Sequence, residues 1–526
     1  MLAPITPFSE VALADALAND HTSSEVIKTK KHFQYLVQYL GDPEVNAKTI
    51  VVEDAYISKD YLHDYASYYS LCFVPYSKLC KRVHFFSLAF SEQEFSNMLE
   101  GRQGPMDIPG SYLGFIVVKP IPYTIIGFTL LKVYSNSPGT RLFWGAKKYV
   151  VHLYGKQLSV ESLAFQEQDT ILAACATTAI WSMLNRASDY HICLLKSPSE
   201  ITKDSGNLSN DGSRLFPNKG LDIRQICQAI YQSGLATEVR QSNVPLPEPP
   251  VTDPPTPPLH PTNIIKKVVS KEYLKKILNA YSSIGIPLIL VVAVPKVVGY
   301  GLHAITVSGF KHPGPTPIPP TTKISYHSDN IEKFYAHDDQ WGPFVRVEWF
   351  SDFEINTPWD RDTRKTYVLQ IIVPTFPKIR IPYEDIQIIV EGLDRILTTI
   401  FGLKTVFDLV WDIKLDFSEN YKKQVADLDP TIFPNKINHL KKSLPKYVWI
   451  ATCYIGANPV LKFAFDATGV EKAMLGLDIL SFLPQEITDD IFSFLDTNKN
   501  NSSIVGVFSH PSSNEYYKFF LDNIKS

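Results

Sequence analysis

The chain of 526 residues is too long for one hydrophobic core, and at about 150 residues per domain its length suggests three or four domains. Its composition, 45% hydrophobic and 20% charged, excludes a largely disordered chain, and the net charge of −3 gives no indication of nucleic acid or an anionic membrane as a partner. The six scattered cysteines are too few for a disulfide framework or a paired zinc site, which favours a reducing compartment.

The start of the chain and its apolar runs carry no targeting or membrane signal. The residues after Met1 lack the basic and apolar regions of a secretory signal. The longest apolar run, 284–295, has 12 residues, fewer than the roughly 20 that span a bilayer. We therefore expect a soluble, cytoplasmic protein that does not enter a membrane.

Residues 1–150 are expected to form an N-terminal α+β domain. Segments 81–90 and 112–119 are rich in aromatic and β-branched residues, which is typical of strands, and helices are expected to precede them. His84 falls in the first of these apolar strands, where a histidine is usually structural, so we assign no chemistry to this domain.

A cysteine near the start of a predicted helix is the first candidate functional residue. From about Ala174 the apolar residues recur with helical spacing, which places Cys175 close to the helix N-terminus. The unpaired amides and the positive end of the helix dipole favour a thiolate there, and the thiolate is the nucleophilic form. The alternative is that Cys175 is an inert, packed thiol. Inert packing is what we expect of Cys193 and Cys453, in apolar strands, and of Cys227, in an amphipathic helix.

Proline is concentrated in two runs of the middle region. The sequence has 38 prolines, nine of them within 245–261 and a shorter run within 313–320. Proline lacks a backbone donor, so such runs favour an extended polyproline conformation instead of a sheet or a helix. The longer run is either a docking segment for a partner protein or a semi-rigid surface loop. We interpret both runs as insertions within one middle domain, 151–378.

A histidine beside glycines is the second candidate functional residue. Segment 286–294 is expected to be a buried strand, and His303 is expected to open the next strand, which Gly309 ends. A histidine at a strand edge can face a cleft and act as a base toward a nearby thiol.

Two carboxylates at the end of an aromatic strand complete the set. The segment 334–344 is expected to run through Asp338 and Asp339 into a turn and a further strand, and a carboxylate there could orient the ring of His303. His337 and these carboxylates could instead bind a metal together with His303. Adjacent residues of a strand point to opposite faces and do not easily converge on one ion, so we do not expect a metal site. We also expect no other cofactor.

Residues 379–526 are expected to form a C-terminal α+β accessory domain. Pro382 can occupy the first turn of a helix with regular apolar spacing. Alternating apolar residues over 407–417 predict a half-buried strand, and the acidic row on its other face, which includes Asp412, is interpreted as solvated. Further strands are expected at 446–454 and 460–465.

The order of Cys175, His303 and Asp339 resembles the papain-like cysteine peptidase superfamily, including its bacteriocin-processing branch. The 128 positions between cysteine and histidine are close to the spacing of about 130 to 150 in papain-like enzymes. Asp-Gln-Trp-Gly at 339–342 is similar to the Asn-Ser-Trp-Gly of the family. The resemblance implies that Asp339, or Asp338 if the register shifts by one, orients His303, and that Gln168 contributes to the oxyanion hole.

The resemblance also implies a fold and an activity. The overall class would be α+β, with a papain-like middle domain in which the helix carrying Cys175 packs on an antiparallel sheet carrying the histidine and the carboxylate. The implied reaction is acyl transfer through a thioester, most simply cleavage of a peptide or protein substrate. A transglutaminase-type or deamidase-type enzyme and an inactive papain-like scaffold are alternatives. A metal hydrolase using His303, His337 and Asp339 is a further one.

Overall fold

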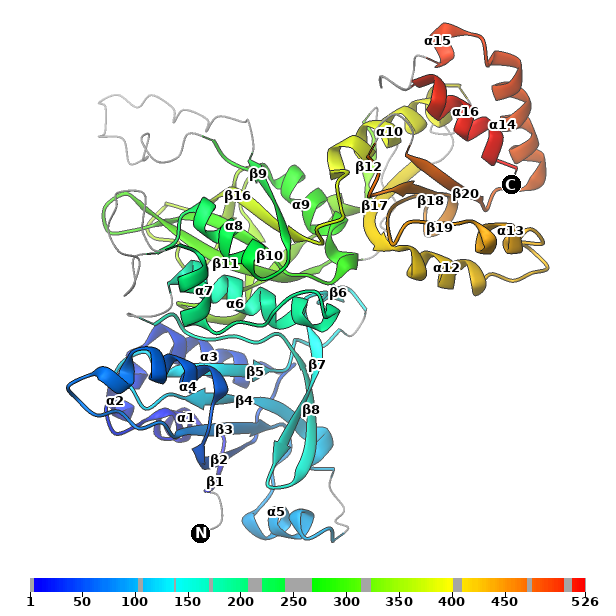
Figure 1. Ribbon diagram of the computed structural model, residues 1–526. Coiled ribbons are helices and arrows are strands. Elements are labelled where there is room, and N and C mark those ends of the chain that lie inside the picture. The colour runs from blue at the N-terminus through cyan, green and yellow to red at the C-terminus, as the bar shows by residue number, and fades with distance from the viewer. Residues whose placement is uncertain are drawn as a thin grey trace. The chain divides into compact units, whose positions relative to one another are not determined.

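The structure is a computed structural model that describes residues 4–102, 107–136, 139–169, 174–206, 220–241, 267–313, 323–400, 409–470, 475–505 and 513–525. Its helices and its largely antiparallel sheets make a mixed α/β fold, in agreement with the expected α+β class (Figure 1). The proline-rich segment 245–261 and nearly all of 313–320 lie outside the described residues, so the docking interpretation stays a prediction.

Contacts divide the chain into two compact units. The first comprises 1–270, 286–310 and 333–374, and the second comprises 271–285, 311–332 and 375–526. The first unit thus joins the expected N-terminal domain to most of the expected middle domain, while two short stretches of the middle region belong to the second unit. The three-domain boundaries at 150 and 378 stay a prediction.

A five-stranded antiparallel sheet forms the N-terminal part of the first unit. The strands predicted at 81–90 and 112–119 are confirmed as its central members, and His84 is fully buried in the first of them, with Nδ1 2.9 Å from the Tyr112 hydroxyl. The strands are β1 (Ile5–Pro7), β2 (Thr49–Tyr56), β3 (Cys80–Phe86), β4 (Tyr112–Val118) and β5 (Ile126–Leu131). The helices of this part are α1 (Glu10–Leu17), α2 (Ser24–Lys28), α3 (Lys31–Gly41), α4 (Lys59–Ser67) and α5 (Glu92–Leu99).

The second sheet of this unit closes into a ring of six strands. Closure arises because β10 (Leu288–Pro295) pairs antiparallel with both β11 (Tyr300–Lys311) and β16 (Thr366–Thr375). The remaining members of the ring are β13 (Lys333–Asp338), β14 (Gly342–Trp349) and β15 (Glu354–Asn356). Paired outside the ring are β6 (Arg141–Leu142) and β9 (Ala236–Gln241), and β7 (Lys147–Leu153) and β8 (Lys156–Ser162) form a separate hairpin. Ring closure fixes the register of neighbouring strands, so residues on β11 and β13 keep constant relative positions.

Helix α6 (Cys175–Ala187) packs on this ring. It contacts β10 and β13, and the helices α7 (Pro198–Asp204) and α8 (Ile223–Gln232) pack beside it (Figure 1). Ile180, Trp181 and Leu184 on α6 are fully buried. The residue before the helix is Ala174, which makes no side-chain cap, so the first amides of α6 have no capping side-chain oxygen.

One hydrophobic core joins the N-terminal part of the first unit to the ring. Phe33 and Leu36 of α3 and Phe85 of β3 belong to the same buried cluster as Tyr335 of β13 and Phe344 of β14. Helix α3 also contacts β14 directly. The N-terminal part is therefore packed against the hairpin that ends in the candidate carboxylates.

The second unit is built on a sheet ordered β12-β17-β18-β19-β20. Its strands are β12 (Ser325–Tyr326), β17 (Leu409–Phe417), β18 (Tyr447–Ile455), β19 (Asn458–Asp466) and β20 (Gly476–Ser481). Its helices are α9 (Lys271–Ala280), α10 (Tyr383–Arg395), α12 (Ser418–Ala426), α13 (Lys436–Lys441), α14 (Gln485–Asn498), α15 (Ser502–Val505) and α16 (Ser513–Asn523). The predicted helix after Pro382 and the strands predicted within 407–465 are confirmed. Within the described residues, no helix has the length and apolar character needed to cross a bilayer.

Three local predictions are wrong. Asp412, in the acidic row of β17, is not solvated: it is buried, with Asn279 Nδ2 donating to its Oδ1 at 2.7 Å. Cys193 lies outside the helices and strands, in a bend after a short helical turn. The strand of His303 begins at Tyr300 and continues past Gly309, where a Cβ atom would lie 2.6 Å from the Phe143 ring. That glycine therefore permits close packing within the strand and does not end it.

Candidate active site

Cys175 is the first residue of α6, as the sequence predicts. Hydrogen bonding with its side chain is one of the causes that raise the pKa of His303, and Cys175 lines a cavity of about 650 Å³ together with that histidine. None of the six cysteines, all of which are described, forms a disulfide, and Cys193 and Cys453 are buried, whereas Cys175 is partly exposed. Burial raises the pKa of Cys193 to about 11, which suits an inert thiol. Cys175 is thus a thiol at an uncapped helix start that faces both a base and an open space.

The ring of His303 lies between the thiol and two carboxylates. It is on β11, 3% exposed, and its Nε2 is 3.0 Å from Asp338 Oδ1 and 3.4 Å from Asp339 Oδ1. Because Nε2 carries a single proton, it makes one good hydrogen bond, and the shorter contact identifies Asp338 as its acceptor. Nδ1 remains as the ring atom available to Cys175.

The carboxylate that accepts from His303 is therefore Asp338, the alternative candidate of the sequence, and Asp339 is its close neighbour. Asp338 is the last residue of β13, and its backbone pairs with Gly342 across the turn that follows. A register shift between Ala336 and Asp338 marks an irregularity at this point of the hairpin. That irregularity cannot be deduced from the sequence, which explains why the motif comparison favoured the following residue.

The charges at this site stabilise a protonated imidazole. Burial alone would lower the pKa of His303, but the adjacent charges of Asp338 and Asp339 and the hydrogen bonds raise it well above the usual value. Burial likewise disfavours the ionised form of Asp338. The charge of His303 and three hydrogen bonds, from His303, the Trp359 indole and the Gln340 amide, nevertheless hold its pKa below the usual value. The pair is an imidazolium beside a carboxylate.

Asp339 behaves differently from its neighbour. Burial raises its pKa to about 7, and the negative charge of Asp338 acts in the same direction, while His303 and Thr178 oppose the shift. Two carboxylates that share one histidine do not both ionise easily. Near neutral pH, Asp338 carries the charge and Asp339 is partly protonated.

The turn that presents these carboxylates is held from several sides. His32 Nε2 on α3 lies 2.8 Å from the Asp339 carbonyl oxygen, and the backbone N–H of Gln168 donates to the same carbonyl at 3.3 Å. Gln340 Nε2 donates to Gln168 Oε1, also at 3.3 Å. Lys30 forms an ion pair of 2.7 Å with Glu167 next to this segment. Gln168 thus contacts the carboxylate turn, and its predicted oxyanion role stays a prediction.

The metal-site alternative that includes His337 is not supported by the geometry. The Nε2 of His337 lies 3.0 Å from the Leu163 carbonyl, and its Nδ1 accepts from the Phe344 amide at 3.1 Å. Both ring nitrogens therefore face away from the cluster. His303, Asp338 and Asp339 still offer ligand atoms within 4.8 Å of one another, so these three meet the spacing that a metal ion needs.

The cavity beside Cys175 and His303 has a largely apolar wall. It is formed between α8, the start of α6 and the strands β10, β11 and β16. The larger apolar side chains in its lining are Leu221, Ile223, Ile226, Val291, Leu302 and Leu369. Such a wall suits a substrate that places an apolar group next to the reacting carbonyl.

Trp359 is a site residue that the sequence did not reveal. It lies between β15 and β16, its Nε1 donates to Asp338 Oδ2 at 2.8 Å, and its ring meets His303 edge-on with centroids 5.3 Å apart. The surrounding Thr-Pro-Trp-Asp carries no catalytic motif, so only the folded structure brings this indole to the site.

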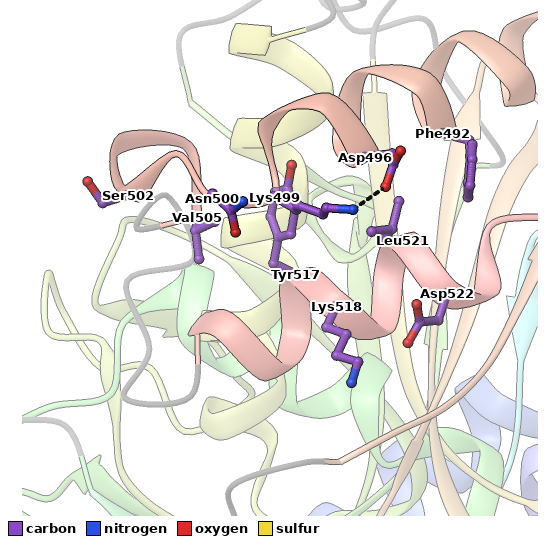
Figure 2. A pocket seen from close by; sticks show the side chains of 10 residues that line it. All are labelled: Phe492, Asp496, Lys499, Asn500, Ser502, Val505, Tyr517, Lys518, Leu521 and Asp522. Atoms are coloured by element: carbon purple, nitrogen blue, oxygen red, sulfur yellow. Dashed lines mark hydrogen bonds and ion pairs between the residues drawn. The ribbon is translucent and has the colours of Figure 1, made fainter.

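A second large cavity lies in the C-terminal helices. Figure 2 shows its lining, which comes from α14, α15 and α16 and includes an ion pair of 2.9 Å between Lys499 and Asp496. Its volume is about 790 Å³, and the described side chains that line it include neither cysteine nor histidine. Among the described residues, the cavity that combines a thiol with an imidazole is therefore the smaller one, beside Cys175 and His303.

No family model matches the chain, and no curated protein sequence matches it.

Proposed function

We propose that the protein is a cysteine-dependent acyl-transfer enzyme, most simply a peptidase with a papain-like catalytic fold. The observation that carries the proposal is the Cys175, His303 and Asp338 arrangement beside an open cavity. A thiol on the first residue of a helix, a base from an adjacent strand and a carboxylate that orients this base meet the requirements of thiol catalysis. The substrate would be a peptide or protein, and neither a metal nor another cofactor is required.

In the first half-reaction, the Cys175 thiolate attacks the carbonyl carbon of the substrate. The carbon becomes tetrahedral, and the negative charge on its oxygen would be stabilised by the Cys175 amide at the start of α6 and, as the resemblance implies, by the side chain of Gln168. The C–N bond then breaks, the leaving amine takes a proton from His303 Nδ1, and a thioester on Cys175 remains.

In the second half-reaction, His303 removes a proton from the acceptor, which attacks the thioester and releases the thiol. Asp338 stays ionised throughout and keeps the ring oriented through its contact with Nε2. Water as the acceptor gives hydrolysis, whereas a primary amine gives transfer. Analysis of products formed with and without an added amine distinguishes a peptidase from the transglutaminase-type alternative.

Covalent trapping tests the proposal without knowledge of the substrate. The full chain is incubated with peptide aldehydes and vinyl sulfones that carry apolar side chains, and adducts are detected by intact mass. We expect one adduct, absent from Cys175→Ala and present in the matched variant Cys227→Ala, since Cys227 is also partly exposed. An adduct that survives Cys175→Ala contradicts the assignment, and a Cys175 that iodoacetamide labels no faster than Cys227 supports the inactive-scaffold alternative.

The remaining alternative, a metal hydrolase, is tested by elemental analysis. A stoichiometric divalent metal in the purified protein, together with loss of activity on chelation, would replace the thiol mechanism with one that uses His303, Asp338 and Asp339 as ligands. We expect no stoichiometric metal and no effect of chelation on the labelling of Cys175.

A further inference from the structure

The orienting carboxylate divides its two oxygens between different donors. Asp338 Oδ1 accepts from His303 Nε2 and from the backbone N–H of Gln340, both at 3.0 Å, while Oδ2 accepts from Trp359 Nε1 at 2.8 Å. Rotation of a carboxylate about its last side-chain bond is soft, so the backbone of Asp338 alone does not fix this arrangement. The indole donor opposes rotation together with the Gln340 backbone N–H, and it is the contact that holds the oxygen not used by the histidine.

Rotation at this position would have a specific consequence. The neighbouring carboxylate, Asp339, is only 3.4 Å from the same His303 nitrogen and competes for its proton. If the Asp338 carboxylate rotated away, the His303 ring would move toward Asp339, and its Nδ1 would no longer point at the Cys175 thiol. A geometric change of about 1 Å at the base is enough to reduce the rate strongly.

Trp359 is itself held by two ammonium groups. Lys31 Nζ lies 4.8 Å and Lys296 Nζ 4.6 Å from the centroid of its ring, and the Trp341 ring meets it edge-on with centroids 6.0 Å apart. Lysines at this distance from an indole are attracted by the negative face of the ring. Lys31 is the first residue of α3, so the N-terminal part of the chain is linked to Asp338 through the side chains of Lys31 and Trp359.

We propose that Trp359 is a positioning residue that keeps Asp338 in the orientation in which it accepts from His303, and that Lys31 keeps Trp359 in place. This inference rests on the proposed function, because it acts on Cys175 only through Asp338 and His303. The proposed role of Lys31 means that the N-terminal part of the first unit contributes to the geometry of the site.

The test measures the second-order rate constant for alkylation of Cys175 by iodoacetamide at pH 6.5, by peptide mass spectrometry on the full chain. Trp359→Phe keeps an aromatic ring and removes the donor. We expect it to slow alkylation about 3- to 10-fold, because the loss of one hydrogen bond to Asp338 should cost no more than the loss of its charge. The matched control is Trp144→Phe, which removes an indole donor to a backbone carbonyl at 3.2 Å, and we expect an unchanged rate.

A double-mutant cycle separates positioning from packing. In an Asp338→Ala background, Trp359→Phe is expected to have no further effect, since the group it positions is gone. An effect of equal size in both backgrounds overturns the inference and assigns Trp359 to packing. A reactive Cys175 whose rate Trp359→Phe leaves unchanged also overturns this inference alone, whereas a native Cys175 that reacts no faster than Cys227 overturns the proposed function itself.

Lys31→Met provides a second, milder test that does not depend on the folding of a tryptophan variant. It retains a long side chain and removes the charge over the indole, and we expect a rate about 2- to 5-fold lower, in line with a single cation–π contact. The control is Lys147→Met, because Lys147 lies 4.8 Å from the Tyr149 ring in the β7–β8 hairpin and is not part of the site. Equal rates for both variants would overturn the role of Lys31.

Discussion

The two carboxylates beside His303 should substitute for each other in part. We consider Asp338→Asn and Asp339→Asn, separately and combined. In the native protein Asp338 is ionised, and its charge is one reason why the pKa of Asp339 is raised to about 7. Once Asp338 is neutral, that repulsion is absent, so Asp339 ionises more readily and can take over the charge opposite the imidazolium.

The distances set the size of the effect. A charge at 3.0 Å or 3.4 Å from His303 Nε2 contributes an attraction on the order of 5 kcal/mol at an effective dielectric constant of about 20. Either carboxylate alone therefore supplies most of what the imidazolium needs. With both replaced, the histidine is neutral near pH 6.5, and an unassisted thiol with the ordinary pKa of about 8.5 is only about 1% ionised there.

We therefore expect Asp339→Asn to change the alkylation rate of Cys175 little and Asp338→Asn to lower it by roughly 10-fold or less. The double variant should fall by about 100-fold, more than the two single effects combined. The assay is iodoacetamide labelling at pH 6.5, with Cys227 in the same sample as the internal reference. A double variant no slower than Asp338→Asn would refute the reasoning that Asp339 acts as a reserve charge.

Other parts of the structure give further predictions. Burial raises the pKa of Asp64 to about 7, so the folded protein favours the neutral carboxyl, and the stability that this form contributes is lost as the pH rises through 7. Asp64→Asn should therefore raise the free energy of unfolding on the order of 2 to 4 kcal/mol at pH 8 and by less at pH 5. Melting temperatures at the two pH values measure this difference. Gly114 has φ of +112°, and a Cβ there would lie 1.9 Å from the Leu130 carbonyl, so Gly114→Ala should cost about 1 to 3 kcal/mol or more; a melting temperature equal to that of the native protein would contradict this. If Gln168 stabilises the oxyanion, Gln168→Ala should lower kcat on a peptide substrate about 100-fold without changing the alkylation of Cys175, whereas equal losses in both would indicate a structural role.

The sequence predicted those elements whose residues pair or pack locally. The alternation in β17 and the apolar spacing in α10 each appear in the structure within a few residues of the predicted bounds. Asp412 was misjudged because a period of two identifies the second face of a strand but does not reveal what covers it, and here Asn279 of α9 lies against it. Burial on that face depends on a segment more than 100 positions away.

The candidate site was predictable to a similar depth. Cys175 at a helix start and His303 on a neighbouring strand follow from local patterns and from their order in the chain. The choice between Asp338 and Asp339 depends on an irregularity in a hairpin, and the contribution of Trp359 depends on a contact across 21 positions. A tertiary contact of one side chain with another leaves no periodic trace in a sequence.

The alternation of the chain between its two compact units has a consequence for how the protein is made. The chain passes from one unit to the other at five points, after residues 270, 285, 310, 332 and 374. The last strand of the closed ring, β16, ends at Thr375, so a chain emerging from the ribosome cannot complete the sheet around His303 before about 70% of it has been synthesised. Such late, non-local pairing is intrinsically slow. During that interval the closed sheet that holds His303 beside Cys175 would be incomplete. Because each unit is assembled from separate stretches of the chain, a single cut by a protease could not release either unit as an intact piece.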